Sequence, residues 1–452
     1  MFASLPVVVV SALAASVAAV PVEERANHGN KGHGPSGNHT RMLSHSGPAE
    51  YYLQYGFRPY YIINNMTESP LKRKLRSCEN GPFEVTSWSV SHRGGATTYI
   101  PEHTAENHAA GARMGAGIME CDVAFTNDLQ LVCRHSLCDL HTTTDILLHP
   151  ALAAKCTQPF KPANGTTPAS ALCCTSDITL AEYKTLCGKM DGSNSSATTP
   201  RAYQSGTPAF RTDLYDTCGT LLTLDSYIDL VNSFPGYRNF TSELKTPPKQ
   251  VPMPFKGVYT QQQYARDMIN AFIRKNIHPS RVWAQSFNGP DIFQWIKEFP
   301  EFGKQALYLD EEGDDGPSAL RAAADRLASL KAQGVNIIAP PINYLIGYGD
   351  ATNRTIAPSY YAQKAKEAGL QILAWTFERS GPLTKVRANN NYYYETFNQA
   401  ISYDGQLYEV LDLLANKIGI IGLFSDDSGV VSFFANCFKL QGLAGGSLKA
   451  RG

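Results

Sequence analysis

The sequence has no excess of charge of either sign. Its 452 residues contain 40 Lys and Arg against 40 Asp and Glu. Without a basic field, attraction to nucleic acid or to an anionic membrane surface is not expected. One long apolar stretch runs from Leu5 to about Val20, and no later stretch reaches the length of a transmembrane helix. We therefore expect neither a nucleic-acid partner nor a transmembrane segment in the mature chain.

The N-terminal apolar stretch is followed by small residues, the pattern of a secretory signal peptide over residues 1–19. The positive charge that usually precedes such a stretch is missing. The polar C-terminal tail lacks the apolar run of a lipid-anchor signal. The ten cysteines are an even number, as disulfide bonding requires. Six sequons for N-linked glycans agree with secretion and lie at Asn38, Asn65, Asn164, Asn194, Asn239 and Asn353. The sequence predicts a secreted, extracellular glycoprotein, for which cell-wall association is one option.

Three segments flank the main domain. Residues 20–48 are rich in Gly, His, Ser and Asn and are predicted to be a disordered segment. Its histidines follow no repeated spacing, which favours a linker over a metal-binding tract. Residues 49–82 are aromatic and then basic, and we expect an N-terminal extension that packs on the main domain. Residues 438–452 are expected to form a flexible tail.

The main domain, residues 83–437, alternates short apolar runs with stretches of helical periodicity. "TQQQYARDMINAFIRKN", "SALRAAADRLASLKAQG" and "SYYAQKAKEAGL" are such stretches. Alternation of strands and helices indicates a parallel sheet, and eight units predict an α/β fold, a (β/α)₈ TIM barrel. A doubly wound open sheet is the alternative. The eight runs are "FEVTSWSVSH", "GIMECDVAF", "YRNFTSELK", "RVWAQSF", "QALYLD", "VNIIAPP", "LQILAWTF" and "GIIGLFSD".

A long insertion separates the second and third strands. "LQLVCRH" is expected to form an extra strand after the second one, and residues 141–220 then hold five cysteines. We interpret them as a disulfide-rich insertion on the C-terminal face of the barrel, acting as a cap over the site. The adjacent Cys173 and Cys174 should bond to different partners, but the sequence leaves the connectivity open.

Acidic side chains end two neighbouring strands. Active sites of such barrels lie at the C-terminal ends of the strands. Glu120 and Asp122 stand two apart on one strand, so both point to the same face. With Glu243 they form an all-oxygen set that suits one divalent cation, Mg²⁺ or Ca²⁺, rather than zinc. The alternative is that these acids are solvated residues at strand ends. Because Glu243 and Lys245 end the next strand, the metal site is favoured over this alternative.

Two histidines also end apolar runs. His92 and His135 are candidates for the general base and the general acid, because imidazole titrates near neutral pH. The cations Arg93 and Lys245 beside the acidic set suit an anionic group such as phosphate. The glycines of "HRGG" let backbone amides approach an anion. The other histidines of the domain, interpreted as turn or surface residues, are His103, His108, His141 and His149.

The segment "SHRGG…PEHTAENHAAGARMGAGIMECDVAFTNDLQLVCRHS" resembles the signature of the glycerophosphodiester phosphodiesterase family. "ITLAEYKTL", "LLTLDSYIDLV", "FTSELK", "WAQSFN", "AGLQILAWTF" and "GLFSDD" extend the resemblance in order over roughly residues 84–430. The resemblance implies a barrel that hydrolyses glycerophosphodiesters, a cation on the three carboxylates, and His92 and His135 as the acid–base pair. Arg93 and Lys245 then hold the phosphate, and Glu102 and Trp375 are assigned to the same substrate pocket.

Two positions depart from the family pattern, His103 in place of Asn and Ser136 in place of Asp. Both are expected to alter the headgroup pocket and neither changes a predicted ligand. Two alternatives stay open. One is a phospholipase C- or D-like phosphodiesterase acting on phospholipid or lysophospholipid, and the other is an inactive secreted binding protein on the same barrel. The intact site residues argue against the second alternative.

Overall fold

The computed structural model describes residues 52–442 except 217, 351 and 353. The predicted signal peptide, the 20–48 segment and most of the predicted C-terminal tail lie outside the described residues.

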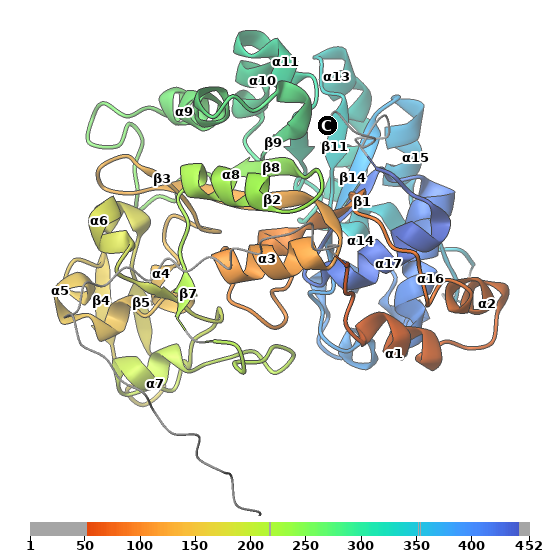
Figure 1. The fold of residues 1–452 in the computed structure, drawn as a ribbon, viewed down its shortest axis with the longest axis horizontal. Coiled ribbons are helices and arrows are strands. Elements are labelled where there is room, and N and C mark those ends of the chain that lie inside the picture. The colour runs from red at the N-terminus through yellow and green to blue at the C-terminus, as the bar shows by residue number, and fades with distance from the viewer. Residues whose placement is uncertain (1–51, 217, 351, 353, 443–452) are drawn as a thin grey trace, which may run out of the picture. The chain divides into compact units, whose positions relative to one another are not determined.

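Eight parallel strands form a closed barrel (Figure 1). They follow the order β1-β15-β14-β11-β10-β9-β8-β2, and pairing of β1 with β2 closes the ring. The predicted TIM barrel is confirmed, and each of the eight predicted runs supplies one strand. The strands are β1 (Thr86–Ser91), β2 (Ala116–Phe125), β8 (Asn239–Leu244), β9 (Val282–Ser286), β10 (Leu307–Leu309), β11 (Ile337–Ala339), β14 (Gln371–Phe377) and β15 (Gly422–Ser425).

Amphipathic helices surround the barrel. In α9 (Gln261–Arg274), Tyr264, Met268 and Phe272 recur at helical spacing and are buried, and the Thr260 side chain caps the first turn. "SALRAAADRLASLKAQG" forms two helices, α12 (Pro317–Asp325) and α13 (Leu327–Ala332), rather than one. The other main helices are α3 (Ala105–Arg113), α8 (Leu224–Ser233), α10 (Gly289–Glu298), α15 (Tyr360–Glu367), α16 (Leu407–Asp412) and α17 (Ser428–Phe438).

The core has two layers. Inward-facing residues of the strands, among them Val90, Ile118 and Leu373, fill the inside of the barrel. A larger cluster fills the space between the strands and the helices. The filled barrel is a rigid support, which holds the polar side chains at the strand ends in fixed positions.

The insertion is stapled by three disulfides, Cys138–Cys174, Cys156–Cys173 and Cys187–Cys218. Cys173 and Cys174 therefore bond to different partners, as predicted. The extra strand β3 (Leu131–Cys133) pairs antiparallel with β2, and Cys121–Cys133 joins the two strands. The short elements beyond β3 lie to one side of the barrel in Figure 1. They are α4 (Leu140–Thr143), α5 (Pro150–Ala153), β4 (Gln158–Lys161), β5 (Ser170–Leu172), α6 (Leu180–Tyr183), β6 (Cys187–Gly188), α7 (Pro200–Gln204) and β7 (Gly219–Thr220).

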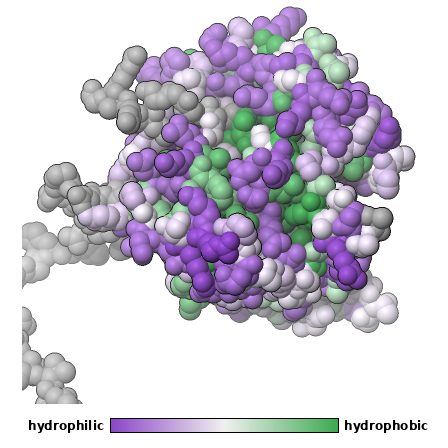
Figure 2. Space-filling model, turned by 90° about the vertical axis from the view of Figure 1, so that its right-hand side faces the viewer, coloured by the Kyte–Doolittle hydropathy of each residue, from purple (hydrophilic) through white to green (hydrophobic). Residues whose placement is uncertain are grey.

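The N-terminal extension packs on the barrel through α1 (Arg58–Asn65) and α2 (Pro70–Arg76). A disulfide joins Cys78 to Cys437 in α17. The first residues of the predicted tail also belong to the fold, because α17 ends at Phe438 and Gly442 bridges to Ser87 at β1. The face drawn in Figure 2 is mostly hydrophilic, with hydrophobic residues gathered between hydrophilic ones. None of the helices among the described residues has the length and hydropathy needed to cross a membrane.

Candidate active site

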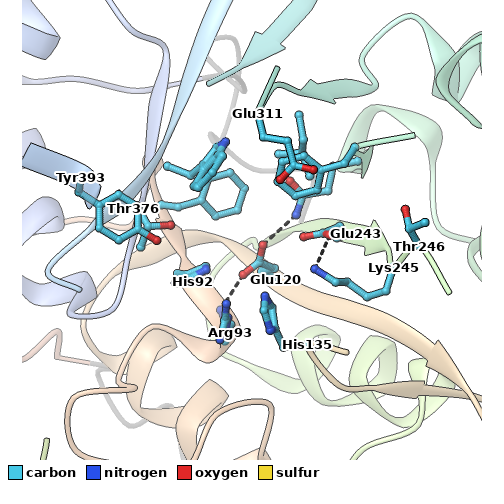
Figure 3. Close-up of a pocket in the computed structure, with 15 residues that line it drawn as sticks. His92, Arg93, Glu120, His135, Glu243, Lys245, Thr246, Glu311, Thr376 and Tyr393 are labelled. Carbon is cyan, nitrogen blue, oxygen red and sulfur yellow. Dashed lines mark hydrogen bonds and ion pairs between the residues drawn. The ribbon is translucent and has the colours of Figure 1, made fainter. Parts of the chain in front are cut away.

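A cavity of about 440 Å³ lies at the C-terminal ends of the strands (Figure 3). Seven of the nine predicted site residues line it: His92, Arg93, Glu120, His135, Glu243, Lys245 and Trp375. Asp122 is 1% exposed and lies beside them, and Glu102 is held behind Arg93. The other lining residues are Thr246, Gln285, Phe287, Leu309, Glu311, Thr376, Tyr393 and Phe424.

Three carboxylates meet where β2 and β8 run side by side. Asp122 stands opposite Glu243 in the strand register, and Glu120 lies two residues earlier on β2. One oxygen of each carboxylate of Glu120, Asp122 and Glu243 lies within 4.8 Å of the others. Asp122 Oδ1 is buried and has no hydrogen-bond partner among the described residues. A buried carboxylate oxygen without a partner beside two further carboxylates fits the donor set of a hard divalent cation.

The pKa values of these acids show the electrostatic cost of the cluster. Burial and then the charge of Asp122 raise the pKa of Glu120 well above its usual value. Burial likewise raises the pKa of Glu243 to about 7, against the opposing charge of Lys245. Burial would also raise the pKa of Asp122, but His103 and Lys245 hold that pKa well below the usual value. Three carboxylates packed this closely cannot all ionise without added positive charge.

His92 is oriented by a carboxylate that follows β15. Its Nδ1 lies 2.5 Å from Asp426 Oδ1, and the ring belongs to the cavity wall. Because an ionised carboxylate only accepts, Nδ1 carries the proton and Nε2 remains a free acceptor in the neutral ring. Burial lowers the pKa of His92 to about 4, with Arg93 acting in the same direction and Asp426 opposing. His92 is therefore neutral near pH 7.

His135 has a different environment. It follows β3 and is half-buried, and neither ring nitrogen has a hydrogen bond to any other described residue. Burial, Arg93 and Lys245 hold the pKa of His135 well below its usual value. An anionic substrate placed between those cations and the ring would offset their effect and favour the protonated form.

Arg93 is fixed in three directions. Its backbone N–H donates to Glu120 Oε2 at 2.7 Å, and its guanidinium lies 3.1 Å from Glu102 and 3.8 Å from Asp122. Glu102 therefore contacts Arg93 rather than the cavity. Gly94 has a packing role, because a Cβ there would lie 2.4 Å from Asn107 Oδ1. The Arg93 amide is bonded to Glu120 and the Gly95 amide to the His92 carbonyl, and the predicted approach of the backbone amides of this turn to a phosphate stays a prediction.

Lys245 and Trp375 both line the cavity, and each lies beside Phe287. The Lys245 ammonium pairs with Glu243 and lies 6.0 Å from the centre of the Phe287 ring. The Trp375 indole N–H donates to the Ala339 carbonyl at 2.7 Å, which leaves the ring against Phe287 and Tyr393. The cation is thus at the acidic cluster, and the indole forms part of an aromatic wall.

His103 lies in a turn, as interpreted, and His108 lies in α3, but neither is a surface residue. Both side chains are fully buried, and His103 Nε2 lies 2.8 Å from Asp122 Oδ2. His103 has the backbone torsion φ 57°, which turns the chain so that its ring reaches the acidic cluster. Sequence position gave no sign of this contact, because His103 follows no apolar run. His141 and His149 are half-buried in the insertion.

Several further residues at the site had no predicted role. Gln285 donates to Glu120 Oε1 at 2.8 Å, and its place at the end of a strand could have indicated it. Asp426, which directly follows β15, accepts hydrogen bonds from Arg379 and Arg211 as well as from His92. Arg211 lies in a loop of the insertion and Arg379 in the loop two residues after β14; neither directly ends a strand, so the strand-end rule did not indicate them.

Comparisons with known proteins identify the family of the chain. Residues 92–430 match the sequence model of the glycerophosphoryl diester phosphodiesterase family. An "Extracellular protein" of Arthroderma benhamiae is 46% identical over 252 residues, which are 56% of this chain and 100% of that protein. A glycerophosphodiester phosphodiesterase of Arabidopsis thaliana is 24% identical over 409 residues, 81% of this chain and 92% of that protein.

Solved structures are also similar. A glycerophosphodiester phosphodiesterase from Agrobacterium tumefaciens is 14% identical, with a TM-score of 0.40, covering 76% of this chain and 98% of that chain. An Oleispira antarctica phosphodiesterase in complex with the product sn-glycerol-3-phosphate is 17% identical, with a TM-score of 0.43, covering 77% of this chain and 96% of that chain. The family match spans the barrel from His92 past the end of β15. The chain belongs to the glycerophosphoryl diester phosphodiesterase family, a family of phosphoric diester hydrolases.

Proposed function

We propose that this protein hydrolyses glycerophosphodiesters to glycerol phosphate and a free alcohol by acid–base catalysis with two histidines. The observation that carries the proposal is the meeting of His92, His135, Arg93 and Lys245 with three carboxylates around one cavity. Family membership supports the reaction class. The assignment of roles to individual residues rests on the geometry.

The proton transfers follow from the two histidine environments. His92 Nε2, free in the tautomer that Asp426 selects, accepts the proton of the glycerol hydroxyl next to the phosphate. That oxygen attacks phosphorus, and the bond to the leaving alcohol breaks. His135 gives its proton to the leaving oxygen. Water then opens the cyclic phosphate, with the two histidines in reversed roles, so that one water is consumed per diester hydrolysed.

Positive charge stabilises the phosphate during the reaction. Arg93 and Lys245 lie on either side of the acidic cluster, where a guanidinium and an ammonium can hold phosphate oxygens. Glu120, Asp122 and Glu243 would hold one Mg²⁺ or Ca²⁺. When bound, that ion supplies charge neutralisation for the phosphodiester and its transition state.

An assay of the purified protein tests this proposal. Glycerophosphocholine, glycerophosphoinositol, a phospholipid and a lysophospholipid are offered separately, and release of glycerol phosphate and of the alcohol is measured. We expect glycerol phosphate from the glycerophosphodiesters. Absence of hydrolysis of all four substrates at added Mg²⁺ and Ca²⁺ would contradict the proposal and favour a binding protein.

A second candidate is phosphodiesterase activity on phospholipid or lysophospholipid. The insertion exposes Phe210, Leu214 and Tyr215, with Leu214 70% exposed, on the loop that sends Arg211 to Asp426. Apolar side chains exposed next to an active site suit contact with a lipid surface. Faster hydrolysis of the lipid substrates than of the glycerophosphodiesters in the same assay would favour this candidate.

We also propose that the protein is secreted and glycosylated. The five disulfides suit an oxidising compartment. Asn164 and Asn194 are exposed and could carry glycans. Asn239 is 1% exposed within β8 and its side chain donates a hydrogen bond to Ser87, so the folded protein does not present this sequon for glycosylation. The proposed organisation is a signal peptide, a linker, an extension and a barrel with one insertion.

A further inference from the structure

The insertion reaches the catalytic end of the barrel through one loop. After α7 the chain runs through residues 206–216 and returns at Cys218, which is bonded to Cys187. The Thr212 backbone N–H donates to the Thr98 carbonyl at 3.2 Å, and Phe210 packs against Gly381. The loop therefore rests on the segments that follow β1 and β14, which both border the cavity.

Arg211 points from this loop into the protein. Its side chain is 3% exposed, and its Nη2 lies 3.4 Å from Asp426 Oδ2. Its Nη1 lies 3.8 Å from Glu102 Oε2. A guanidinium is rarely buried this far unless carboxylates compensate for the lost hydration. The two carboxylates that neutralise Arg211 each contact a predicted site residue as well: Asp426 bonds to His92, and Glu102 bonds to Arg93.

The two carboxylate oxygens of Asp426 accept hydrogen bonds from different residues. Oδ1 accepts from His92, whereas Oδ2 accepts from Arg379 at 2.9 Å and from Arg211. Two guanidinium groups on one oxygen fix the plane of the carboxylate and turn the other oxygen toward the imidazole. Although burial would raise it, the charge of Arg379, the hydrogen bond from His92 and the charge of Arg211 hold the pKa of Asp426 below its usual value. The carboxylate thus stays ionised.

We propose that Arg211, supplied by the disulfide-rich insertion, is a positioning residue that fixes Asp426 and Glu102 and through them orients His92 and Arg93. This inference rests on the proposed function of the two histidines and the cavity. It gives the insertion a part in the chemistry. Arg211 does not line the cavity, so its effect on substrate binding is indirect.

The test compares Arg211→Met and Arg211→Lys with Arg201→Met, a change at an exposed arginine of the same insertion. Substrate is the glycerophosphodiester that the wild-type protein hydrolyses fastest, and kcat, KM and Tm are measured for each variant. Loss of an orienting partner typically costs about 10–100-fold, so we expect kcat of Arg211→Met to fall by about that factor with KM changed less than threefold. Arg211→Lys should retain an intermediate kcat, and Arg201→Met should match the wild type.

Added guanidinium separates positioning from a merely structural role. Arg211→Ala leaves a space of the shape of the lost group, and millimolar guanidinium chloride should restore part of its kcat without raising that of Arg201→Met. If Arg211→Met proves unstable, the kcat of Arg211→Lys and the rescue of Arg211→Ala by guanidinium still distinguish a positioning role from a structural one. Wild-type kcat in Arg211→Met, or a loss proportional to the fall in Tm that neither lysine nor guanidinium relieves, would overturn the inference. A wild-type protein inactive on every phosphodiester would instead overturn the proposed function itself.

Discussion

The two sides of the cavity are built from different kinds of residue. The ends of β1, β2 and β8 supply charged or titratable groups, including His92, Glu120 and Lys245. The ends of β9, β10 and β14 supply Gln285, Leu309 and Trp375; Phe287 follows β9, and the acidic Glu311 follows β10 and also lines the cavity. The first side gathers the groups that can move protons and hold a phosphate, whereas the second, apart from Gln285 and Glu311, offers shape and apolar contact. We infer that the first side determines the rate and the second determines which alcohol fits.

The histidines give the sharpest test of this contrast. Loss of a proton-transfer group costs about 10²–10⁴-fold in rate, and we expect that loss in kcat for His92→Ala and for His135→Ala. A diester with a nitrophenol leaving group needs little protonation, so it should restore much of the rate of the variant that lacks the acid. The environments of the rings predict rescue of His135→Ala. Rescue of His92→Ala alone would reverse the two roles.

His103 should show a smaller effect on the same side. Its ring holds Asp122, so His103→Ala leaves a buried carboxylate without its closest partner. Removal of a group that orients a ligand costs about 10–100-fold in metal affinity or activity. We expect the concentration of Mg²⁺ or Ca²⁺ that gives half-maximal activity to rise by that factor. His141→Ala, in the insertion, is the control, and equal behaviour of the two variants would remove His103 from the site.

Trp375 tests the other side. Trp375→Ala removes an aromatic wall that contacts Phe287 and Tyr393, and loss of such a contact is worth about 1–3 kcal/mol. We expect KM to rise about tenfold for the preferred substrate with kcat changed little, and the order of preference among leaving alcohols to change. A kcat loss as large as that of His92→Ala, with preference unchanged, would place Trp375 with the reactive side.

The smallest expected effect is that of pH on kcat/KM between pH 7 and pH 5. Burial lowers the pKa of His92 to about 4, so protonation of this base inactivates the enzyme only when pH falls toward that value. At saturating cation, kcat/KM should therefore keep most of its value from pH 7 down to about pH 5, below the pKa of about 6.5 of an ordinary histidine. An acid limb with its midpoint at pH 6.5 or above, and unchanged in Asp426→Asn, would contradict the environment described for His92.

The sequence predicted the barrel well because its signals are local. Each apolar run between helical stretches became a strand, and the rule that strand ends form the site brought Glu120, Asp122 and Glu243 together. The contacts of His103, Arg211 and Arg379 were not predictable in this way. Their side chains reach the site from a turn, from the insertion and from a loop, and only the folded path of the chain brings them there. Glu102 was assigned to the substrate by resemblance, whereas its place is behind Arg93.

Chelation tests the central claim most directly, namely that the acidic cluster beside the histidines works with a bound cation. Wild-type protein is exhaustively chelated and dialysed, and glycerol phosphate release from its best glycerophosphodiester is measured before and after Mg²⁺ or Ca²⁺ is returned. Asp122→Asn is treated in parallel, with circular dichroism as the check on folding. We expect chelation to abolish activity, one of the two ions to restore it, and Asp122→Asn to respond at much higher ion concentration. Full activity of the chelated wild-type protein would contradict the account.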